Sequence, residues 1–230
     1  MKKSYGKQER RAGVKIAILG GTGEQGPGLA LRWAHAGQEV IIGSRQQEKG
    51  ERVATELNQE LGKDLLRGTD NVTAAAEADV VFITVPYSAH AKTVESVKDQ
   101  LKGKIFVDVS VPLDPDNARR VIMPAAGSAA EEAKHILGDD VQVVCALQNI
   151  SAHLLRDIKA EIDCDVLICG DKDARPTVIE LVEKLGIHTV DVGPLAAASL
   201  IEPLTALLIR LNIRNKVHSA GIRITGLPEG

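Results

Sequence analysis

The chain has 230 residues, 44% of them hydrophobic, which is enough to bury a substantial core in one domain or in a domain with a small appendage. Its 28 basic and 31 acidic residues give a net charge of -3, and it has one Trp, two Tyr and two Phe, so it lacks the basic field and the stacking platforms that nucleic-acid binding uses. No apolar run reaches the roughly 18 residues of a membrane span, no signal peptide is recognisable and the three cysteines lack metal-ligand spacing. We therefore expect a cytoplasmic protein with small-molecule partners and no metal.

Apolar runs alternate with amphipathic segments along the chain. The runs predict strands over residues 14–19, 39–43, 79–85, 104–109, 141–147, 165–169 and 188–192. Helices are predicted over residues 27–36, 46–61, 72–78, 88–101, 129–138, 174–185 and 196–211. A short segment at 65–68, to which no helix or strand is assigned, leads to the helix at 72–78. The stretch 111–127 is rich in Pro, Asp and Asn and is expected to be a loop. Strands that alternate with helices favour parallel pairing through right-handed crossovers, so the predicted fold is α/β, a doubly wound parallel sheet.

A glycine-rich turn follows the first predicted strand directly and opens the first predicted helix. Its residues are Gly21, Thr22, Gly23, Glu24, Gln25 and Gly26, which satisfy G-x-G-x-x-G. In this setting the first glycine permits the tight turn, the second leaves room for a pyrophosphate, and the third lets helix and strand approach. The amides at the start of the helix attract phosphate groups. A glycine-rich turn without a ligand is the bland alternative, and the strand–turn–helix context favours dinucleotide binding over it.

The residues after the second predicted strand indicate which dinucleotide binds. NAD-binding folds place an Asp or Glu there to accept hydrogen bonds from the ribose hydroxyls, whereas this chain has Ser44 and Arg45. Lys49 lies one helical turn further on, and Thr22 can add a contact from the glycine turn. Solvated charges at the start of a surface helix would look the same, but the missing acid and the guanidinium together favour the 2'-phosphate of NADP.

Two further strand ends are expected to line the same crevice, because ligands of doubly wound sheets bind outside the carboxyl ends of the strands. They are Val85, Pro86 and Tyr87 after one strand, and Val111 and Pro112 after the next. Prolines that merely terminate strands remain an equally good explanation for either one alone.

The segment VKIAILGGTGEQGPGLALRWAHAGQEVIIGSRQQEK resembles the opening of the NADPH:coenzyme F420 oxidoreductases, also called NADPH-dependent deazaflavin reductases. The segments DVVFITVP, GSAAEEAKHIL, VVCALQNISAHLL, DVLICGD and DVGPLAAASLIEPLTALLIRLN resemble successive parts of the same family, so the similarity covers about residues 14–212. The resemblance implies hydride transfer between NADP(H) and the deazaflavin coenzyme F420, with the protein as a template that holds two rings together and supplies no side-chain acid. It also implies a homodimer.

The resemblance further implies the residues of the two binding sites and the division of the chain. The NADP site comprises Gly21, Thr22, Gly23, Glu24, Gln25, Gly26, Ser44, Arg45, Lys49, Val85, Pro86, Tyr87 and Ala152. The deazaflavin site comprises Val111, Pro112, Gln148, Asn149, Ile150, Gly193, Pro194 and Leu195. A basic extension (1–13) precedes a Rossmann-like NADP-binding domain (14–150), and a small carboxyl-terminal α/β domain (151–230) completes the deazaflavin pocket.

Several alternatives stay open beside the deazaflavin reductase. An NADPH-binding redox sensor would share the glycine turn, as would an imine, ketone or ferric reductase acting on another small substrate. His90 and His153 lie near the expected crevice, but a lone histidine is more often structural than catalytic. Tyr87 and Lys92 are five residues apart, which does not match the Tyr-x-x-x-Lys pair of the short-chain dehydrogenases.

Overall fold

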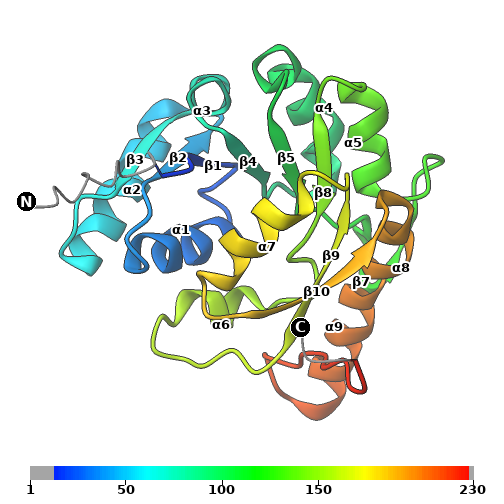
Figure 1. Cartoon of the computed structure of the whole chain (residues 1–230). Helices are drawn as coiled ribbons and strands as arrows, with labels where there is room; N and C mark the ends of the chain where they lie inside the picture. Colours follow the sequence, from blue (N-terminus) through cyan, green and yellow to red (C-terminus); the bar gives the residue numbers. More distant parts are fainter. Residues whose placement is uncertain (1–12, 228–230) are drawn as a thin grey trace, which may run out of the picture.

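The computed structural model describes residues 13–227, and its centre is an eight-stranded sheet (Figure 1). The strands are β1 (Ile16–Leu19), β2 (Val40–Ser44), β3 (Leu66–Asp70), β4 (Val80–Ile83), β5 (Ile105–Asp108), β8 (Gln142–Cys145), β9 (Asp165–Gly170) and β10 (His188–Gly193). Their order across the sheet is β10-β9-β8-β5-β4-β1-β2-β3. Six neighbouring strands, from β3 to β8, are parallel, so the expected doubly wound α/β fold is confirmed.

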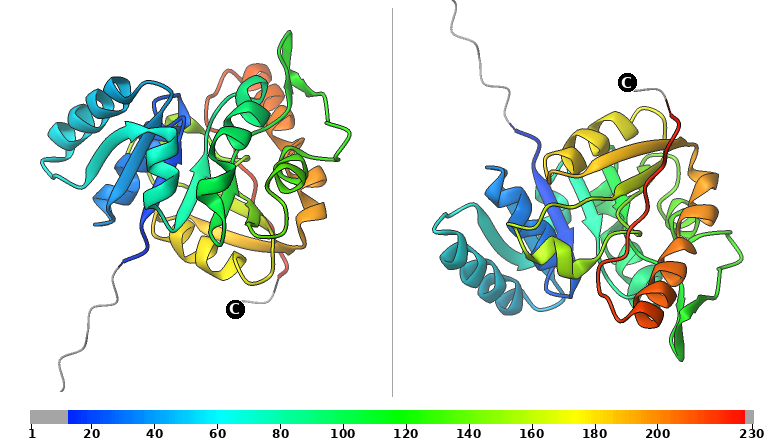
Figure 2. Two further views of the ribbon diagram at one scale, coloured as in Figure 1. Left: turned by 90° about the horizontal axis from the view of Figure 1, so that it is seen from above. Right: turned by 90° about the horizontal axis from the view of Figure 1, so that it is seen from below.

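Helices cover both faces of this sheet, as Figure 2 shows from above and below. Alternate strand residues point to opposite faces: Ile16 and Ile18 belong to one apolar core, and Ala17 and Leu19 to the other. The first core is covered by α1 (Gln25–His35), α2 (Gln47–Leu61), α6 (Ala152–Arg156) and α7 (Arg175–Glu183). The second is covered by α3 (Asn71–Glu77), α4 (Tyr87–Val97), the 3₁₀ turn Lys98–Leu101, α5 (Ala129–Leu137) and α8 (Ala198–Ile201).

The last two strands depart from the predicted parallel pairing. β9 pairs antiparallel with β8, with Cys145 opposite Cys169, and β10 is parallel to β9. A parallel connection needs a crossover of a dozen or more residues, usually a helix that spans the sheet. The connection from β8 to β9 holds only the five-residue α6, so the chain turns back. The expectation of parallel pairing throughout is therefore wrong for the β8–β9 pair, and β9 and β10 run against the other six strands.

Three further expectations about local structure are corrected. Part of the stretch 111–127 forms an antiparallel hairpin, β6 (Leu113–Asp114) with β7 (Asn117–Val121). The segment at 65–68 belongs to the edge strand β3. The helix predicted over 196–211 is three pieces, namely the 3₁₀ turn Leu195–Ala197, α8 and α9 (Leu204–Asn215), because Pro203 lacks the N–H that a continuous helix requires. The same stretch, Leu195–Asn215, is long and apolar enough to cross a membrane by length and composition alone, contrary to the expectation that no segment of the chain is.

Residues on both sides of the boundary proposed at 150 share one sheet and one core. Ile18 and Phe82 lie in the same apolar cluster as Val166 and Leu181, and the Trp33 indole donates a hydrogen bond to the Leu181 carbonyl over 2.8 Å. The carboxyl-terminal part therefore extends the sheet of the first part. The basic extension, apart from Gly13, lies outside the described residues.

Candidate functional site

The glycine turn lies between β1 and α1 and is shaped by close approaches at Gly20 and Gly26. Gly20, at the end of the strand, has φ +67°, and a Cβ there would lie 2.4 Å from Val85 Cγ1. A Cβ on Gly26 would lie 2.5 Å from the Cα of Gly21, so the turn closes on itself only with glycine at both positions. By contrast, a Cβ on Gly23 would meet only the carbonyl oxygens of Gly20 at 3.4 Å and Thr84 at 3.8 Å, which are ordinary van der Waals distances. The fold itself therefore tolerates a side chain at the second glycine, and a pyrophosphate that lies against the turn would not.

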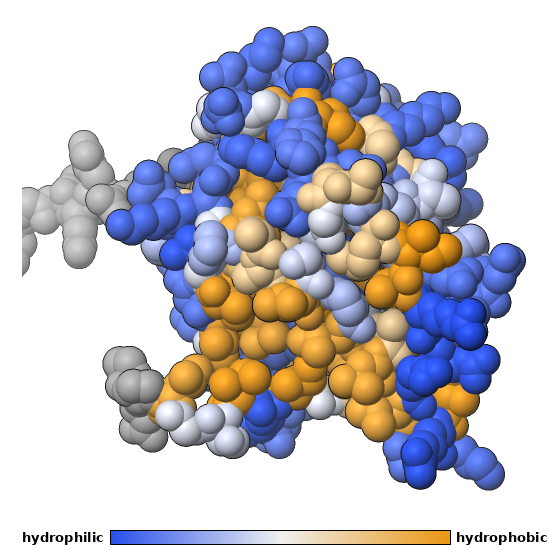
Figure 3. All heavy atoms as spheres, turned by 90° about the vertical axis from the view of Figure 1, so that its right-hand side faces the viewer, coloured by the Kyte–Doolittle hydropathy of each residue, from blue (hydrophilic) through white to orange (hydrophobic). Residues whose placement is uncertain are grey.

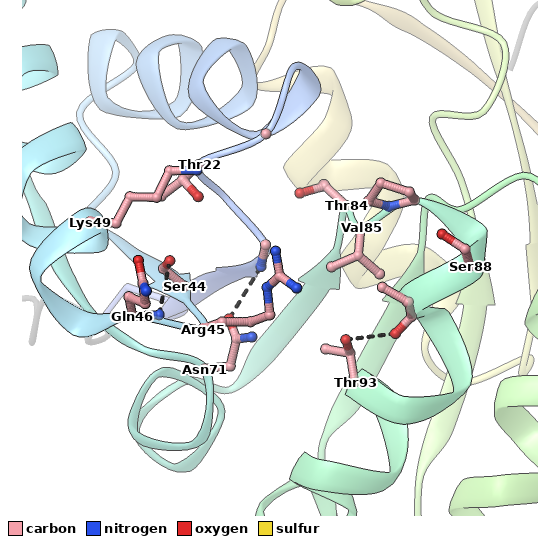
Figure 4. A pocket seen from close by; sticks show the side chains of 14 residues that line it. Thr22, Ser44, Arg45, Gln46, Lys49, Asn71, Thr84, Val85, Ser88 and Thr93 are labelled. Atoms are coloured by element: carbon pink, nitrogen blue, oxygen red, sulfur yellow. Dashed lines mark hydrogen bonds between the residues drawn. The ribbon is translucent and has the colours of Figure 1, made fainter.

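A first cavity of about 670 Å³ opens beside this turn (Figure 4). Thr22, Ser44 and Lys49 lie on one side of it, and Arg45 extends between them and Val85. Ser44 is buried and accepts a hydrogen bond from the Gln46 amide, whereas Arg45 and Lys49 are exposed and form no ion pair with any described residue. No described Asp or Glu lines the first cavity. Its lining residues are Gly20, Thr22, Gly23, Ser44, Arg45, Gln46, Lys49, Asn71, Thr84, Val85, Pro86, Ser88, Ala89 and Thr93. A cavity with two uncommitted cations and no carboxylate suits a phosphate monoester.

A second cavity of about 570 Å³ meets the first at Gly23 and at the residues that follow β4. It reaches across the ends of β5 and β8 to α9 and the carboxyl-terminal tail. Its lining residues are Gly23, Glu24, Gln25, Thr84, Val85, Pro86, Tyr87, Val109, Ser110, Val111, Leu113, Gln148, Asn149, Ile150, Ser151, Ala152, Thr205, Leu208, Ile209, Asn212 and Ala220. Two adjoining cavities on either side of one glycine turn can hold two ligands end to end.

Most residues expected at the site line one of these cavities. The exceptions at the second cavity are Pro112, which is buried beside it, and the run of Gly193, Pro194 and Leu195. That run follows β10, where Gly193 pairs with Cys169 and the Leu195 carbonyl faces the Cys169 thiol. Since β10 runs against the six parallel strands, its carboxyl end does not join theirs. The structure thus leaves these three residues apart from the cavity.

The neighbouring amides Gln148 and Asn149 have different surroundings. Asn149 donates to the Asp165 carbonyl over 2.6 Å and accepts from the Leu167 amide, so its side chain is occupied in pairing with β9. Gln148 Nε2 donates to the Asp108 carbonyl over 2.6 Å, while Gln148 Oε1 is buried and has no partner among the described residues. The opposite amide orientation would bring two oxygens together, so Oε1 is the atom of Gln148 left without a partner, in a residue that lines the second cavity.

Comparison with known proteins identifies the family of the chain. Residues 15–112 match the protein family described as NADP oxidoreductase coenzyme F420-dependent. The F420-dependent NADP reductase of Methanothermobacter marburgensis is 48% identical over 94% of this chain and 100% of its own length, and that of Methanocaldococcus jannaschii is 42% identical over 93% and 99%. The chain belongs to the F420-dependent NADP reductase family. A solved F420-dependent NADP reductase from Arthrobacter sp. FB24 superposes with a TM-score of 0.81 at 26% identity, covering 93% of this chain and 100% of that one.

More distant matches share only part of this picture. The metalloreductase STEAP3 of Rattus norvegicus is 31% identical, but the chain covers 37% of that protein. The reductive aminase of Aspergillus terreus, solved with NADPH, has a TM-score of 0.63 at 14% identity and shows likeness of fold alone. Full-length agreement therefore lies with the F420-dependent NADP reductase family.

Sequence reasoning missed the wall that α9 provides. Thr205, Leu208 and Asn212 recur at spacings of three and four, so they share one helix face, and that face lines the second cavity. Thr205 and Asn212 are polar residues on the helix face that an apolar helix would bury, and this pattern could have indicated the wall.

Proposed function

We propose that this chain transfers hydride between NADP(H), bound at the glycine turn, and coenzyme F420, bound in the second cavity. The observation that carries the proposal is the junction of the two cavities at Gly23, Thr84, Val85 and Pro86. Ligands on either side of this junction share one boundary, where the nicotinamide and the deazaflavin ring would meet. Hydride moves from ring to ring, and a proton from solvent balances reduction of the deazaflavin.

The roles of the chain's residues follow from their positions. Arg45 and Lys49 neutralise the 2'-phosphate, with the hydroxyls of Ser44 and Thr22 as further donors. Gly23 admits the pyrophosphate. Gln148 Oε1, the buried acceptor without a partner, receives an N–H from the ring that occupies the second cavity. The protein acts by orienting two rings at near-attack distance, which alone can contribute several kcal/mol to catalysis, on the order of 7 to 11 in well-oriented systems.

The alternatives are weaker on specific grounds. A redox sensor binds NADPH without turnover and has no use for a second cavity that opens onto the same boundary. Imine reductases and the reductive aminase share the fold, but the chain covers only about 60% of their solved chains, for instance 60% of the imine reductase of Streptomyces aurantiacus. No resemblance over the full length supports those activities.

One assay tests the proposed activity. Purified protein is mixed with NADPH and oxidised coenzyme F420, and the visible absorbance of the deazaflavin is followed. Its loss, with stoichiometric oxidation of NADPH, is the expected result. Binding of NADPH without any loss of absorbance would overturn the proposal in favour of the sensor.

The quaternary state forms part of the same proposal: the chain is a cytoplasmic homodimer with no membrane or nucleic-acid partner. Apolar side chains gather over the face that carries α8 and α9 (Figure 3). They are Leu200, Leu207, Leu211, Ile213, Val217, Ile224 and Leu227, and Leu200 is 72% exposed. A contiguous apolar face of this kind marks a protein interface, and a second copy brings an identical face to cover it. Light scattering that gives the monomer mass, or binding of the protein to lipid vesicles, would contradict this.

A further inference from the structure

A buried histidine lies directly behind the second cavity. His90, on α4, is 0% exposed and lies between two carboxylates. Its Nε2 is 2.7 Å from Asp108 Oδ2 at the end of β5, and its Nδ1 is 3.3 Å from Glu132 Oε2 on α5. A neutral imidazole has one N–H and one lone pair, and the lone pair would then face a carboxylate oxygen. Only the imidazolium donates to both, so the geometry itself indicates a charged ring.

The surroundings of the ring agree with this assignment. Burial lowers the pKa of His90, but the charges and hydrogen bonds of Asp108 and Glu132 outweigh burial, so its pKa lies above the ordinary value. Glu202, which follows α8, Tyr87, on α4 itself, and Cys145, which pairs with Asp108 from β8, are further titratable groups beside this cluster. Tyr87 stacks on the imidazole with ring centroids 5.7 Å apart and donates its hydroxyl to Glu132.

Both carboxylates also hold residues that line the second cavity. Asp108 Oδ1 accepts from the Ser110 amide over 2.9 Å, and the Asp108 carbonyl accepts from Gln148 Nε2. Glu132 holds the Tyr87 hydroxyl over 3.1 Å. Ser110, Gln148 and Tyr87 all line that cavity, on three different segments. The His90 ring is thus the common partner of the two carboxylates that hold Ser110 and Tyr87, and Gln148 is bound to the backbone of the same Asp108.

We infer that His90 is a positioning residue for the second substrate: its positive charge holds the two carboxylates that fix Tyr87 and Ser110 in the cavity wall, and loss of its proton weakens binding of the deazaflavin. This inference rests on the proposed function. The ring does not act as a general acid, because both nitrogens are engaged by carboxylates and the side chain lines neither cavity. The effect therefore falls on affinity for the second substrate and leaves the hydride step itself unchanged.

The test is the pH dependence of coenzyme F420 binding, measured by the fluorescence of F420, in the wild-type protein and four variants. Wild-type protein should bind with constant affinity at low pH and lose about tenfold as the ring deprotonates at alkaline pH. Glu132→Gln removes one of the two carboxylates and should move this loss to lower pH by about one unit. His90→Gln should bind F420 weakly and should lack the pH-dependent loss of affinity that the imidazole causes. Its kcat should stay within about tenfold of wild type. Ionisation of F420 itself affects wild type and variants equally, so the inference is tested by the differences between their pH profiles.

Controls separate the inference from a purely structural role and from failure of the proposed function. Glu95→Gln changes the same charge on an exposed position of α4 and should leave the pH profile in place. Glu202→Gln should retain the alkaline loss, and disappearance of that loss would assign it to Glu202 and overturn the inference. An unmoved profile in folded Glu132→Gln, checked by circular dichroism, would also overturn it. Absence of F420 binding to wild-type protein at every pH would instead reject the proposed function, and this inference with it.

Discussion

The Thr205 hydroxyl donates a hydrogen bond to the Gln148 carbonyl over 2.7 Å, across 57 residues of sequence. This contact joins α9 to the segment after β8, so the two walls of the second cavity are held together directly. Thr205→Val keeps the shape and removes the donor, which costs about 1 to 3 kcal/mol when a buried carbonyl loses its partner. We expect a lower Tm and a KM for F420 raised several-fold, with NADPH affinity unchanged. Thr55→Val, on an exposed helix face, is the control, and equal KM values for both variants would contradict the expectation.

Cofactor selection should depend on Arg45. A charge-assisted hydrogen bond to phosphate contributes about 1.5 to 3 kcal/mol, so Arg45→Ala should raise the KM for NADPH at least about tenfold and leave that for NADH nearly unchanged. Arg52→Ala, further along the exposed side of α2, supplies a matched loss of charge. Equal constants for NADPH and NADH in the unmodified protein would show that the first cavity does not select the 2'-phosphate.

The two later glycines of the turn should respond differently to the same substitution. Gly23→Val meets no close protein atom, so the protein should fold normally while NADPH affinity falls below detection. Gly26→Val would place its Cβ 2.5 Å from the Cα of Gly21, so the turn itself must open and the Tm should drop sharply. Circular dichroism and NADPH fluorescence titration measure both effects. Unchanged NADPH affinity in Gly23→Val would mean that phosphates bind elsewhere.

Crowding the second cavity should harm the reaction more than removing a histidine does. Val111→Trp should block F420 binding and preserve NADPH binding, because Val111 lines the second cavity and not the first. His153→Ala should leave turnover within about tenfold, less than the hundredfold or more that loss of a general acid costs. If His153→Ala loses about a thousandfold in kcat with both ligands still bound, the template mechanism is incorrect.

Stability should fall as pH rises across the neutral range because of Glu202. Burial raises the pKa of this carboxyl to about 8, although the amides of Ala129 and Ala130 favour its charged form. Its folded pKa exceeds its unfolded value of 4.5, so the folded state holds the proton and stability declines from about pH 4.5 through about 8. His90 adds a loss in the same direction, from its unfolded value of 6.5 upward through its raised folded pKa. Glu202→Gln should show a smaller change of Tm over this range, and an unaltered slope would refute the assignment.

The parts of the fold that local chemistry determines were predictable from the sequence. The glycine turn, the cations that follow β2 and the strands of the parallel region all follow from residue type at a fixed spacing. The direction of β9 was not predictable, since it depends on how a short connection packs against α1 and on the Asn149 side chain that pairs with β9. The resemblance alone assigned Gly193, Pro194 and Leu195 to the deazaflavin site, and the direction of β10 sets them apart from the second cavity.

The buried cluster around His90 was beyond sequence reasoning for a similar reason. Its members come from α4, β5 and α5, and nothing in their spacing along the chain indicates contact. The wall on α9 was partly accessible through Thr205 and Asn212, but its position over the cavity depends on Pro203 and on the tail, whose Ile222 carbonyl accepts from the Asp165 amide. Local patterns thus defined the cofactor side, and long-range packing defined the second-substrate side.

The uneven burial of the two sides of the site bears on how the molecule opens. β4 and β5 are central strands whose residues are almost all buried, whereas α9 buries only Ala206 and Leu208. Segments with few buried apolar side chains open at a lower free energy than the core. The wall on α9 can therefore open while the parallel strands stay folded, and amide protons of α9 should exchange with solvent sooner than those of β4 and β5.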